Sequence, residues 1–189
     1  TKGMSVADIG KMQKCSEHKI NYWIRKYDIR KRTIAEAMYA KNNPDGDPFQ
    51  IKSIHTLHDA KLLGIGIGLF WGEGTKKSKN SVRLGNTDPG LIRSYLKFLI
   101  EICGIEQKKL KFSLQIFSDM PKNDTLQFWL NNLKKFGILK KQFSKITVTR
   151  ARSIGTYREK TKHGVLAVYF HNTKLKKLID TMIADVAQW

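Results

Sequence analysis

The stretch that decides the fold is LLGIGIGLFWGEG, residues 62–74. It completes a long apolar segment, residues 56–74, whose length and composition predict a helix. Gly64, Gly68 and Gly72 recur at every fourth position, so they would line one face of that helix with backbone alone. Each glycine costs a helix about 1 kcal/mol relative to alanine, and very close contact with another helix would offset that cost. We expect the partner helix to lie in a second copy of the chain or, alternatively, in the same domain.

Downstream of this helix, the chain alternates between predicted strands and predicted helices. Polar and apolar residues alternate, as in half-buried strands, in the segments 81–86, 109–117 and 145–149. A fourth segment, 164–170, is apolar on both faces and is therefore expected to be central. Helices are predicted at 88–104, 124–136 and 173–186, the first with Asp88 as its cap and Pro89 in its first turn. This order of elements predicts an α+β domain.

The composition points to a nucleic-acid partner. The chain has 35 Lys and Arg against 16 Asp and Glu, a formal net charge of +19. The excess lysine and arginine side chains repel one another unless a bound polyanion relieves the repulsion. The sequence has no run of about 18 apolar residues, the length needed to span a membrane. It also has no segment that resembles a signal peptide. With only two cysteines, Cys15 and Cys103, a disulfide framework is not expected. We expect an intracellular protein of the cytoplasm or nucleoid, with no membrane partner.

Motifs for small ligands are incomplete in this sequence. Gly66 and Gly68 lack the third glycine of a dinucleotide fingerprint, and there is no Walker lysine. His55 and His58 are three residues apart, but without a cysteine or a third histidine nearby they fall short of a zinc signature. We therefore expect no small-molecule substrate.

The N-terminal residues have helix-turn-helix spacing. Residues 5–24 read as two short helices, with Ser5 and Asp8 forming a capping box and Ser16 capping the second helix. Polar side chains that reach base edges are required on a recognition helix. The second helix offers Lys19, Asn21 and Arg25 for this role. The alternative is an ordinary amphipathic hairpin with a solvated charged face, but the overall charge favours DNA binding.

A linker separates this module from the rest of the chain. Residues 42–49, NNPDGDPF, concentrate turn-forming Pro, Gly, Asp and Asn. We therefore divide the chain into a small all-α helix-turn-helix module with its linker, residues 1–45, and a second domain, residues 46–189.

The second domain resembles a known family of nucleases. The run GIGLFWGEG, residues 66–74, is similar to the motif of LAGLIDADG homing endonucleases, with Trp71 in place of a more polar residue and Glu73 in place of aspartate. The resemblance extends from about Leu57 to the C-terminus. It implies a mixed α/β core with an antiparallel sheet that binds the DNA major groove. It also implies a homodimer, because this chain has one copy of the motif, with Gly64, Gly68 and Gly72 at the interface.

Glu73 is the candidate metal ligand and catalytic residue. A carboxylate at a helix C-terminus meets the negative end of the helix dipole, and a bound cation would reverse that unfavourable interaction. In the family the equivalent acidic residue holds a divalent metal near the scissile phosphate, so the resemblance implies Mg²⁺ or Mn²⁺ at Glu73. Alternatively, Glu73 faces solvent or pairs with Lys76 or Lys77.

Basic and polar residues on the outward positions of the strands are candidates for DNA contacts. Cations there could reach phosphate or guanine, and Gln, Ser or Thr could read base edges. Lys145 is also our candidate for a second catalytic residue, as an electrophile or a water-orienting group. The candidates in this domain are Arg83, Lys109, Lys111, Ser113, Gln115, Lys145, Thr147, Thr149, Arg150 and Arg152.

The sequence therefore predicts a site-specific double-stranded DNA-binding protein with metal-dependent phosphodiester cleavage, acting as a homodimer in the manner of an intron or intein homing endonuclease. The alternative on the same fold is a non-catalytic DNA-binding transcriptional regulator, favoured by the departures at Trp71 and Glu73. RNA binding is disfavoured because no aromatic platform of the RNP type is present.

Overall fold

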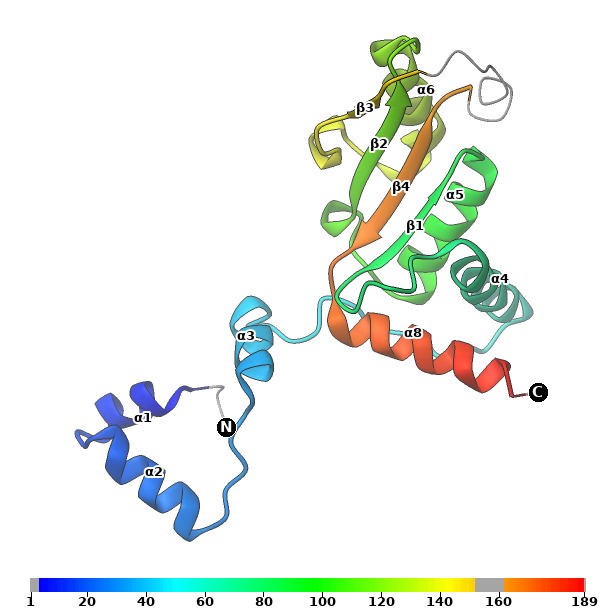
Figure 1. Cartoon of the computed structure of the whole chain (residues 1–189). Coiled ribbons are helices and arrows are strands. Elements are labelled where there is room, and N and C mark those ends of the chain that lie inside the picture. The colour runs from blue at the N-terminus through cyan, green and yellow to red at the C-terminus, as the bar shows by residue number, and fades with distance from the viewer. Residues whose placement is uncertain (1–3, 152–161, 189) are drawn as a thin grey trace. The chain divides into compact units, whose positions relative to one another are not determined.

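The chain folds into two compact units in a computed structural model, which describes residues 4–151 and 162–188. The first unit is Thr1–Pro48 and the second is Phe49–Trp189 (Figure 1). The division falls within the predicted linker, three residues after the boundary predicted from the sequence. Arg152, one of the predicted DNA-binding residues, lies outside the described residues.

The first unit contains three helices, α1 (Val6–Met12), α2 (Glu17–Lys26) and α3 (Ile34–Asn42). The two predicted caps are confirmed, since the Ser5 hydroxyl accepts from the Asp8 amide at 3.1 Å and the Ser16 hydroxyl accepts from the Lys19 amide at 3.3 Å. Helices α1 and α2 pack against each other across a short turn. Among the described residues of this unit only Gly10 is buried, so its core is thin.

Helix α3 was not anticipated from the sequence. A capping box formed by Thr33 and Glu36 starts it, and the Arg30 guanidinium also donates to the Glu36 carboxylate at 2.6 Å. Its apolar residues are not arranged on one face, and Ile34 is 86% exposed. Because helical periodicity signals one-sided burial, a helix that buries little shows no such pattern, and the local signal for α3 is its Thr33–Glu36 capping box.

The second unit is a sheet with helices on one face. The described part of this unit contains, in chain order, α4 (Leu57–Glu73), β1 (Val82–Asn86), α5 (Pro89–Lys97), the π-helical segment η1 (Phe98–Ile102), the 3₁₀ turn η2 (Gln107–Lys109), β2 (Lys111–Phe117), α6 (Lys122–Leu133), the 3₁₀ turns η3 (Lys134–Phe136) and η4 (Lys140–Gln142), β3 (Thr147–Thr149), β4 (Val165–Phe170) and α8 (Thr173–Val186). None of the described helices is long and apolar enough to cross a membrane.

The sheet has the strand order β1-β4-β2-β3. The prediction that residues 164–170 form a central strand is confirmed, because β4 pairs with both β1 and β2, antiparallel in each case. The expectation of a wholly antiparallel sheet is wrong at one edge, where β3 runs parallel to β2. The chain leaves the end of β2 and returns through α6 before entering β3, and such a crossover connection is what joins parallel strands.

One face of the sheet carries the core. Alternate residues of the three longer strands are fully or almost fully buried, as strand periodicity requires: Val82 and Leu84, Phe112, Leu114 and Ile116, and Leu166, Val168 and Phe170. They pack under α5 and α6, which lie behind the sheet in Figure 1 and contribute large buried side chains such as Tyr95 and Trp129. The other alternate set of strand residues therefore faces away from the helices.

Helix α4 packs against its own domain through a glycine that the stripe does not include. A Cβ on Gly66 would lie 2.0 Å from Cγ of Phe98, so only glycine fits there. A Cβ on Gly64, Gly68 or Gly72 would have no neighbour within 4 Å in residues 4–151 and 162–188. The alternative in which the stripe packs within its own domain is therefore wrong, because the stripe lies on the outer face of α4.

Residues 49–52 form a strap that fastens the start of the second unit. The amides of Gln50 and Lys52 donate to the carbonyls of Cys103 and Ile102 at 2.9 and 2.8 Å. Lys52 also forms an ion pair with the buried Asp59 carboxylate at 2.8 Å. Gly104 adopts a φ of 63°, and a Cβ there would lie 2.6 Å from the Gln50 carbonyl oxygen. These contacts explain why the second unit begins at Phe49.

Candidate nucleic-acid interface

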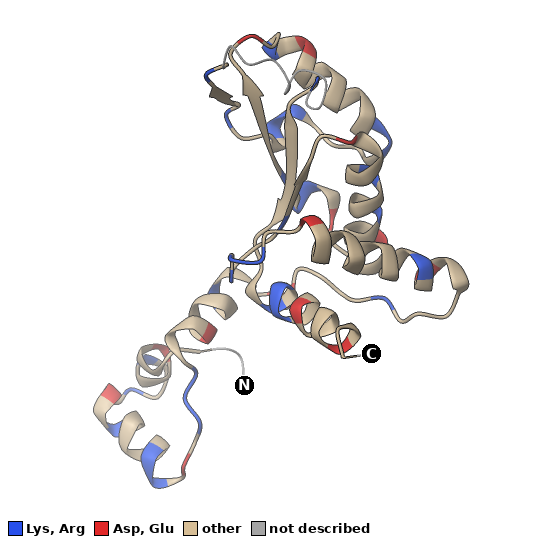
Figure 2. Cartoon of the chain, turned by 45° about the vertical axis from the view of Figure 1, so that its right-hand side comes forward, with Lys and Arg blue, Asp and Glu red and all other residues tan. Residues whose placement is uncertain are grey.

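The described strand residues on the face of the sheet opposite the helices are mostly polar and include no carboxylate. The four strands have the sequences VRLGN, KFSLQIF, TVT and VLAVYF, without Asp or Glu. Arg83, Lys111, Gln115 and Thr147 are exposed on it, and no described helix covers it. In Figure 2 the acidic segments lie on helices and loops, while basic residues occur in both units. This face is therefore open to an anionic partner.

A row of three side chains crosses one end of this face. The strand register places Arg83 opposite Tyr169, and Tyr169 opposite Lys111. The Arg83 guanidinium lies over the Tyr169 ring, 5.8 Å from its centroid, and its Nη2 donates to the Ser113 hydroxyl at 3.4 Å. A cation above an aromatic ring at an exposed site is stabilised by about 0.5–1 kcal/mol. These two contacts restrict Arg83 to a few orientations on an otherwise open surface.

A second polar row lies further along β2. Gln115 is opposite Thr147 on one side and Val165 on the other. Its Nε2 donates to the Thr149 hydroxyl at 3.0 Å, which holds the amide in place and leaves its oxygen free to accept a hydrogen bond.

Small residues occupy the sheet between these two rows. Gly85 is opposite Ala167, and Ala167 is opposite Ser113. The space above Gly85 is bounded by two small side chains, since a Cβ there would meet Cβ of Ala167 at 3.4 Å and Cγ1 of Val165 at 3.6 Å. The side chains at the centre of the face are therefore short, which makes the centre lower than the two rows beside it. A ligand lying across this low centre can approach the backbone.

The structure places six of the predicted DNA-binding residues together on this face: Arg83, Lys111, Ser113, Gln115, Thr147 and Thr149. Lys145 and Arg150 are exposed on either side of β3. Lys109 is the exception, because it lies in η2 rather than in the strand and pairs with Glu106 at 2.7 Å. Hydrogen bonds from Lys108 and Lys109 lower the pKa of the Glu106 carboxyl to about 2.

The two predicted catalytic residues lie at opposite edges of the sheet. Glu73 ends α4 beside edge strand β1, since Gly74 pairs with Leu84 and the Thr75 amide donates to the Arg83 carbonyl at 2.8 Å. Lys145 precedes β3, the other edge strand, and β4 and β2 lie between them. Adjacent strands are about 4.8 Å apart, so three spacings separate these edges. The structure does not bring Lys145 to Glu73.

The Glu73 carboxylate is exposed and forms no ion pair or hydrogen bond with the described residues, including Lys76 and Lys77. Within residues 4–151 and 162–188 no three His, Cys, Asp or Glu side chains come together as a metal-binding group. One chain therefore offers a single carboxylate here. Mg²⁺ is commonly held by one or two carboxylates together with waters and phosphate oxygens, and a second copy of α4 is one source of the second carboxylate.

In the first unit, the predicted recognition residues lie on α2. Lys31 donates to the Asn21 side-chain oxygen at 2.6 Å, and Arg25 donates to the Asn21 carbonyl at 3.4 Å. Lys19 is exposed near the start of the helix. Lys26 lies over the Trp23 ring at 5.0 Å. The exposed residues of α2 thus include basic side chains, which could contact phosphate, together with the aromatic rings of Tyr22 and Trp23.

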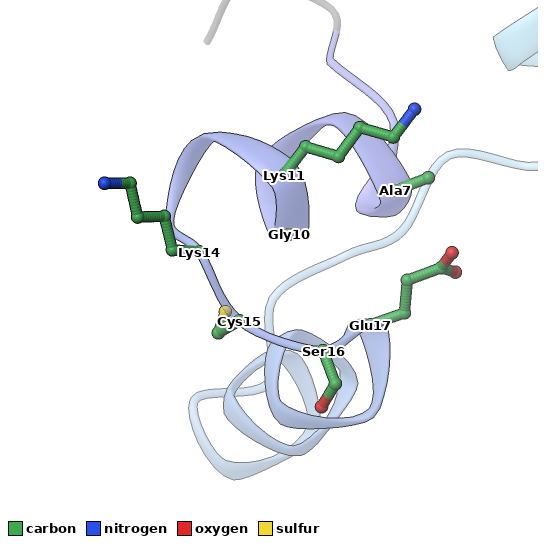
Figure 3. Close-up of a pocket in the computed structure, with 7 residues that line it drawn as sticks. All are labelled: Ala7, Gly10, Lys11, Lys14, Cys15, Ser16 and Glu17. Carbon is green, nitrogen blue, oxygen red and sulfur yellow. The ribbon is translucent and has the colours of Figure 1, made fainter.

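A shallow hollow of about 440 Å³ lies where the turn joins α1 to α2 (Figure 3). Lys11 and Lys14 extend outwards from its rim in different directions, while Cys15 and Ser16 line the turn itself. The backbone reverses at Lys14, whose φ is 51°. The hollow is a consequence of this tight turn, and its charged lining residues are Lys11, Lys14 and Glu17.

Two features of the interface were missed from the sequence. From the sequence alone Tyr169 belongs only to an apolar strand, and nothing marks Gly85 and Ala167 as the low centre of a face. The sequence does contain the corresponding features, which are a tyrosine near the end of a predicted strand and small residues at alternate strand positions. Their significance depends on the pairing of β1, β4 and β2, which no local pattern specifies.

Comparison of the chain with protein families, with curated proteins and with solved structures finds no match in any of the three.

Proposed function

We propose that this protein binds double-stranded DNA, with the open face of the sheet in the major groove. The observation that carries the proposal is a carboxylate-free face with Arg, Lys, Gln, Ser and Thr side chains, in a chain of net charge +19. A β-sheet surface fits the major groove, where each base pair presents a distinct pattern of donors and acceptors. An intracellular location, in the cytoplasm or nucleoid, belongs to this proposal.

The first unit is proposed to add a second set of DNA contacts as a helix-turn-helix module. Lys19 and Arg25 are exposed on α2, Asn21 is half-buried on the same helix, and Arg30 and Lys31 follow the helix. Their role would be to bind phosphate and base edges next to the site bound by the sheet. Two units joined by a linker increase affinity because the second binding event becomes intramolecular.

A homodimer is proposed to form through the outer face of α4. The stripe of Gly64, Gly68 and Gly72 is open, and Ile65 and Trp71 beside it are 50% and 43% exposed. An apolar helix face of this kind is unfavourable in water. Pairing it with the same face of a second copy would bury both and bring two Glu73 residues together at the foot of the helices.

Phosphodiester cleavage is the proposed reaction at the foot of α4. Glu73 of each copy would serve as a ligand to Mg²⁺ or Mn²⁺, and a cation bound there would polarise the phosphate and activate water. The sheet residues would hold the duplex so that one phosphate of each strand faces this carboxylate pair. Lys145 is proposed as a phosphate contact, since its distance from Glu73 makes a catalytic role unsuitable.

A non-catalytic DNA-binding regulator is the second candidate. One specific observation favours it: no described basic or acidic side chain contacts Glu73, so each chain brings one isolated carboxylate to the proposed catalytic centre. The two candidates share the DNA interface and differ only in cleavage.

The test is to select from randomised duplex DNA with and without Mg²⁺, then sequence the bound molecules and the cut molecules. We expect enrichment of specific sequences, with cuts only when Mg²⁺ is present. Lys111→Ala should weaken binding to all sequences and reduce the slope of log affinity against log salt by about one. Lys97→Ala, an exposed lysine on α5, is the matched control and should change neither. Unchanged binding in Lys111→Ala would remove the sheet from the interface, and binding without cutting would favour the regulator.

A further inference from the structure

We infer that the sheet face of each chain specifies its DNA target at two positions, a guanine read by Arg83 and an adenine read by Gln115, about four base pairs apart. The base pairs between them are read weakly. This inference rests on the proposed DNA binding and names the feature of the target that the face recognises.

Arg83 is suited to guanine because its orientation is set before DNA arrives. The guanidinium is held over Tyr169 and donates one hydrogen bond to Ser113. A guanidinium has five N–H donors, so most remain available. Two donors that point from a fixed plane match the O6 and N7 acceptors of guanine. No carboxylate in the four strands competes for them.

Gln115 is suited to adenine by the same reasoning. One of the two N–H bonds on its Nε2 is directed to Thr149. The other N–H and the side-chain oxygen can pair with N7 and the N6 amino group of adenine. Because the amide is already anchored, little further side-chain entropy is lost when it binds.

The separation of the two positions follows from the strand register. Arg83 is in the same row as Lys111, and Lys111 and Gln115 are four residues apart in β2. At about 3.3 Å per residue this is a distance of about 13 Å along the strand. Base pairs are spaced by about 3.4 Å along B-DNA, so strands that follow the groove place these two contacts about four base pairs apart.

The side chains in the row between Arg83 and Gln115 are short. Gly85 has no side chain, Ala167 has a methyl group, and the Ser113 hydroxyl already accepts from Arg83. Short side chains make few contacts to base edges, so substitutions of the intervening base pairs should cost little.

Tyr169 acts as a positioning residue in this arrangement. It contacts Arg83 through its ring, and His171 packs against the same ring edge-on at 5.0 Å. Removing the ring should therefore weaken the preference for guanine without affecting the preference for adenine. Tyr169→Phe keeps the ring and should retain both preferences.

The experiment is selection from randomised duplex DNA, without added divalent metal, for the full chain and for Arg83→Ala, Gln115→Ala, Tyr169→Leu and Tyr169→Phe. The wild type should enrich a guanine and an adenine about four base pairs apart, each preferred by about 5- to 150-fold over other bases. Arg83→Ala should lose only the guanine preference and Gln115→Ala only the adenine preference. Tyr169→Leu should reduce the guanine preference alone. Melting temperatures would identify any variant that fails to fold.

The outcomes separate this inference from the proposed function. If the wild type enriches a sequence but Arg83→Ala and Gln115→Ala enrich the same one, the inference is overturned and DNA binding stands. If Tyr169→Leu leaves the guanine preference intact, the positioning role is overturned. If no duplex is bound at all, the proposed function fails, and this inference fails with it.

Discussion

Glu73 is the residue on which the proposed cleavage would depend, and replacing one carboxylate oxygen by an amide nitrogen isolates the effect of its charge. Glu73→Gln keeps the shape of the side chain but removes the negative charge that a divalent cation requires. We expect this variant to bind DNA at least as tightly as wild type, because a repulsive charge near phosphate has gone, and to lose nearly all Mg²⁺-dependent cleavage. Binding assays and cleavage assays on one selected duplex measure both. Cleavage by Glu73→Gln at the wild-type rate would falsify the metal role.

Tyr95 presents a different problem at the residue scale, because its hydroxyl is buried and has no hydrogen-bond partner among the residues that the structure describes. Burial raises the pKa of this phenol well above its usual value, so the group is neutral, and an unpaired buried hydroxyl is destabilising. Tyr95→Phe should therefore increase the free energy of unfolding by about 1 kcal/mol, measured by urea denaturation. Tyr27→Phe, at a tyrosine 64% exposed, is the control and should change little. A loss of stability in Tyr95→Phe would show that the hydroxyl finds a partner in solution.

Helix α4 has two glycine faces, and equal substitutions on them should have opposite effects. Gly66→Ala places a methyl group against Phe98 and should destabilise the chain by about 1–3 kcal/mol. Gly68→Ala meets nothing within 4 Å and should favour the helix by up to about 1 kcal/mol in a monomer. Gly68→Leu should abolish the proposed dimer. Thermal melting and light scattering distinguish these effects, and a wild type that is monomeric even on DNA would contradict the dimer.

The strap and α4 are held together by the Lys52–Asp59 ion pair, which makes the stability of this connection depend on pH. The hydrogen bond from Lys52 holds the pKa of Asp59 below its ordinary value of 3.8. A carboxyl with a lowered pKa stabilises the fold above its unfolded-state pKa, and the effect is lost as the pH falls through its folded-state pKa. Asp59→Asn should therefore lower stability at neutral pH and reduce its decline between about pH 5 and pH 2. The measurement is the free energy of unfolding of both proteins as a function of pH. An equal decline in the two proteins across this range would show that the Lys52–Asp59 pair does not cause the pH dependence.

At the scale of the whole molecule, the two units have separate cores. The second unit begins at Phe49 with its own hydrogen bonds to residues 102 and 103. Deletion of residues 1–48 should therefore leave the second unit folded, with a cooperative thermal transition, and should reduce DNA affinity because the proposed α2 contacts are lost. Circular dichroism and binding at fixed salt test the two parts. Insoluble protein would argue against independent folding, and unchanged affinity would argue against a DNA-binding role for the first unit.

The sequence by itself determined most of the elements, because their signals are local. Ser5 with Asp8, and Asp88 with Pro89, mark helix starts through contacts within a few residues. Alternation in residues 111–117 separates a buried face from a polar one, and the final helix begins and ends where it was predicted. The open polar face could be predicted in the same way, because successive strand residues point to opposite sides of a sheet, so the polar alternate residues must share a face.

Only the tertiary structure decided how these faces are combined. The parallel pairing of β3, the row from Arg83 through Tyr169 to Lys111 and the distance between Glu73 and Lys145 all depend on strand order and register. The outward direction of the glycine stripe likewise depends on which side of α4 meets Phe98. These are contacts between residues far apart in the chain, selected by packing of the whole core, and a local pattern of residues carries no record of them.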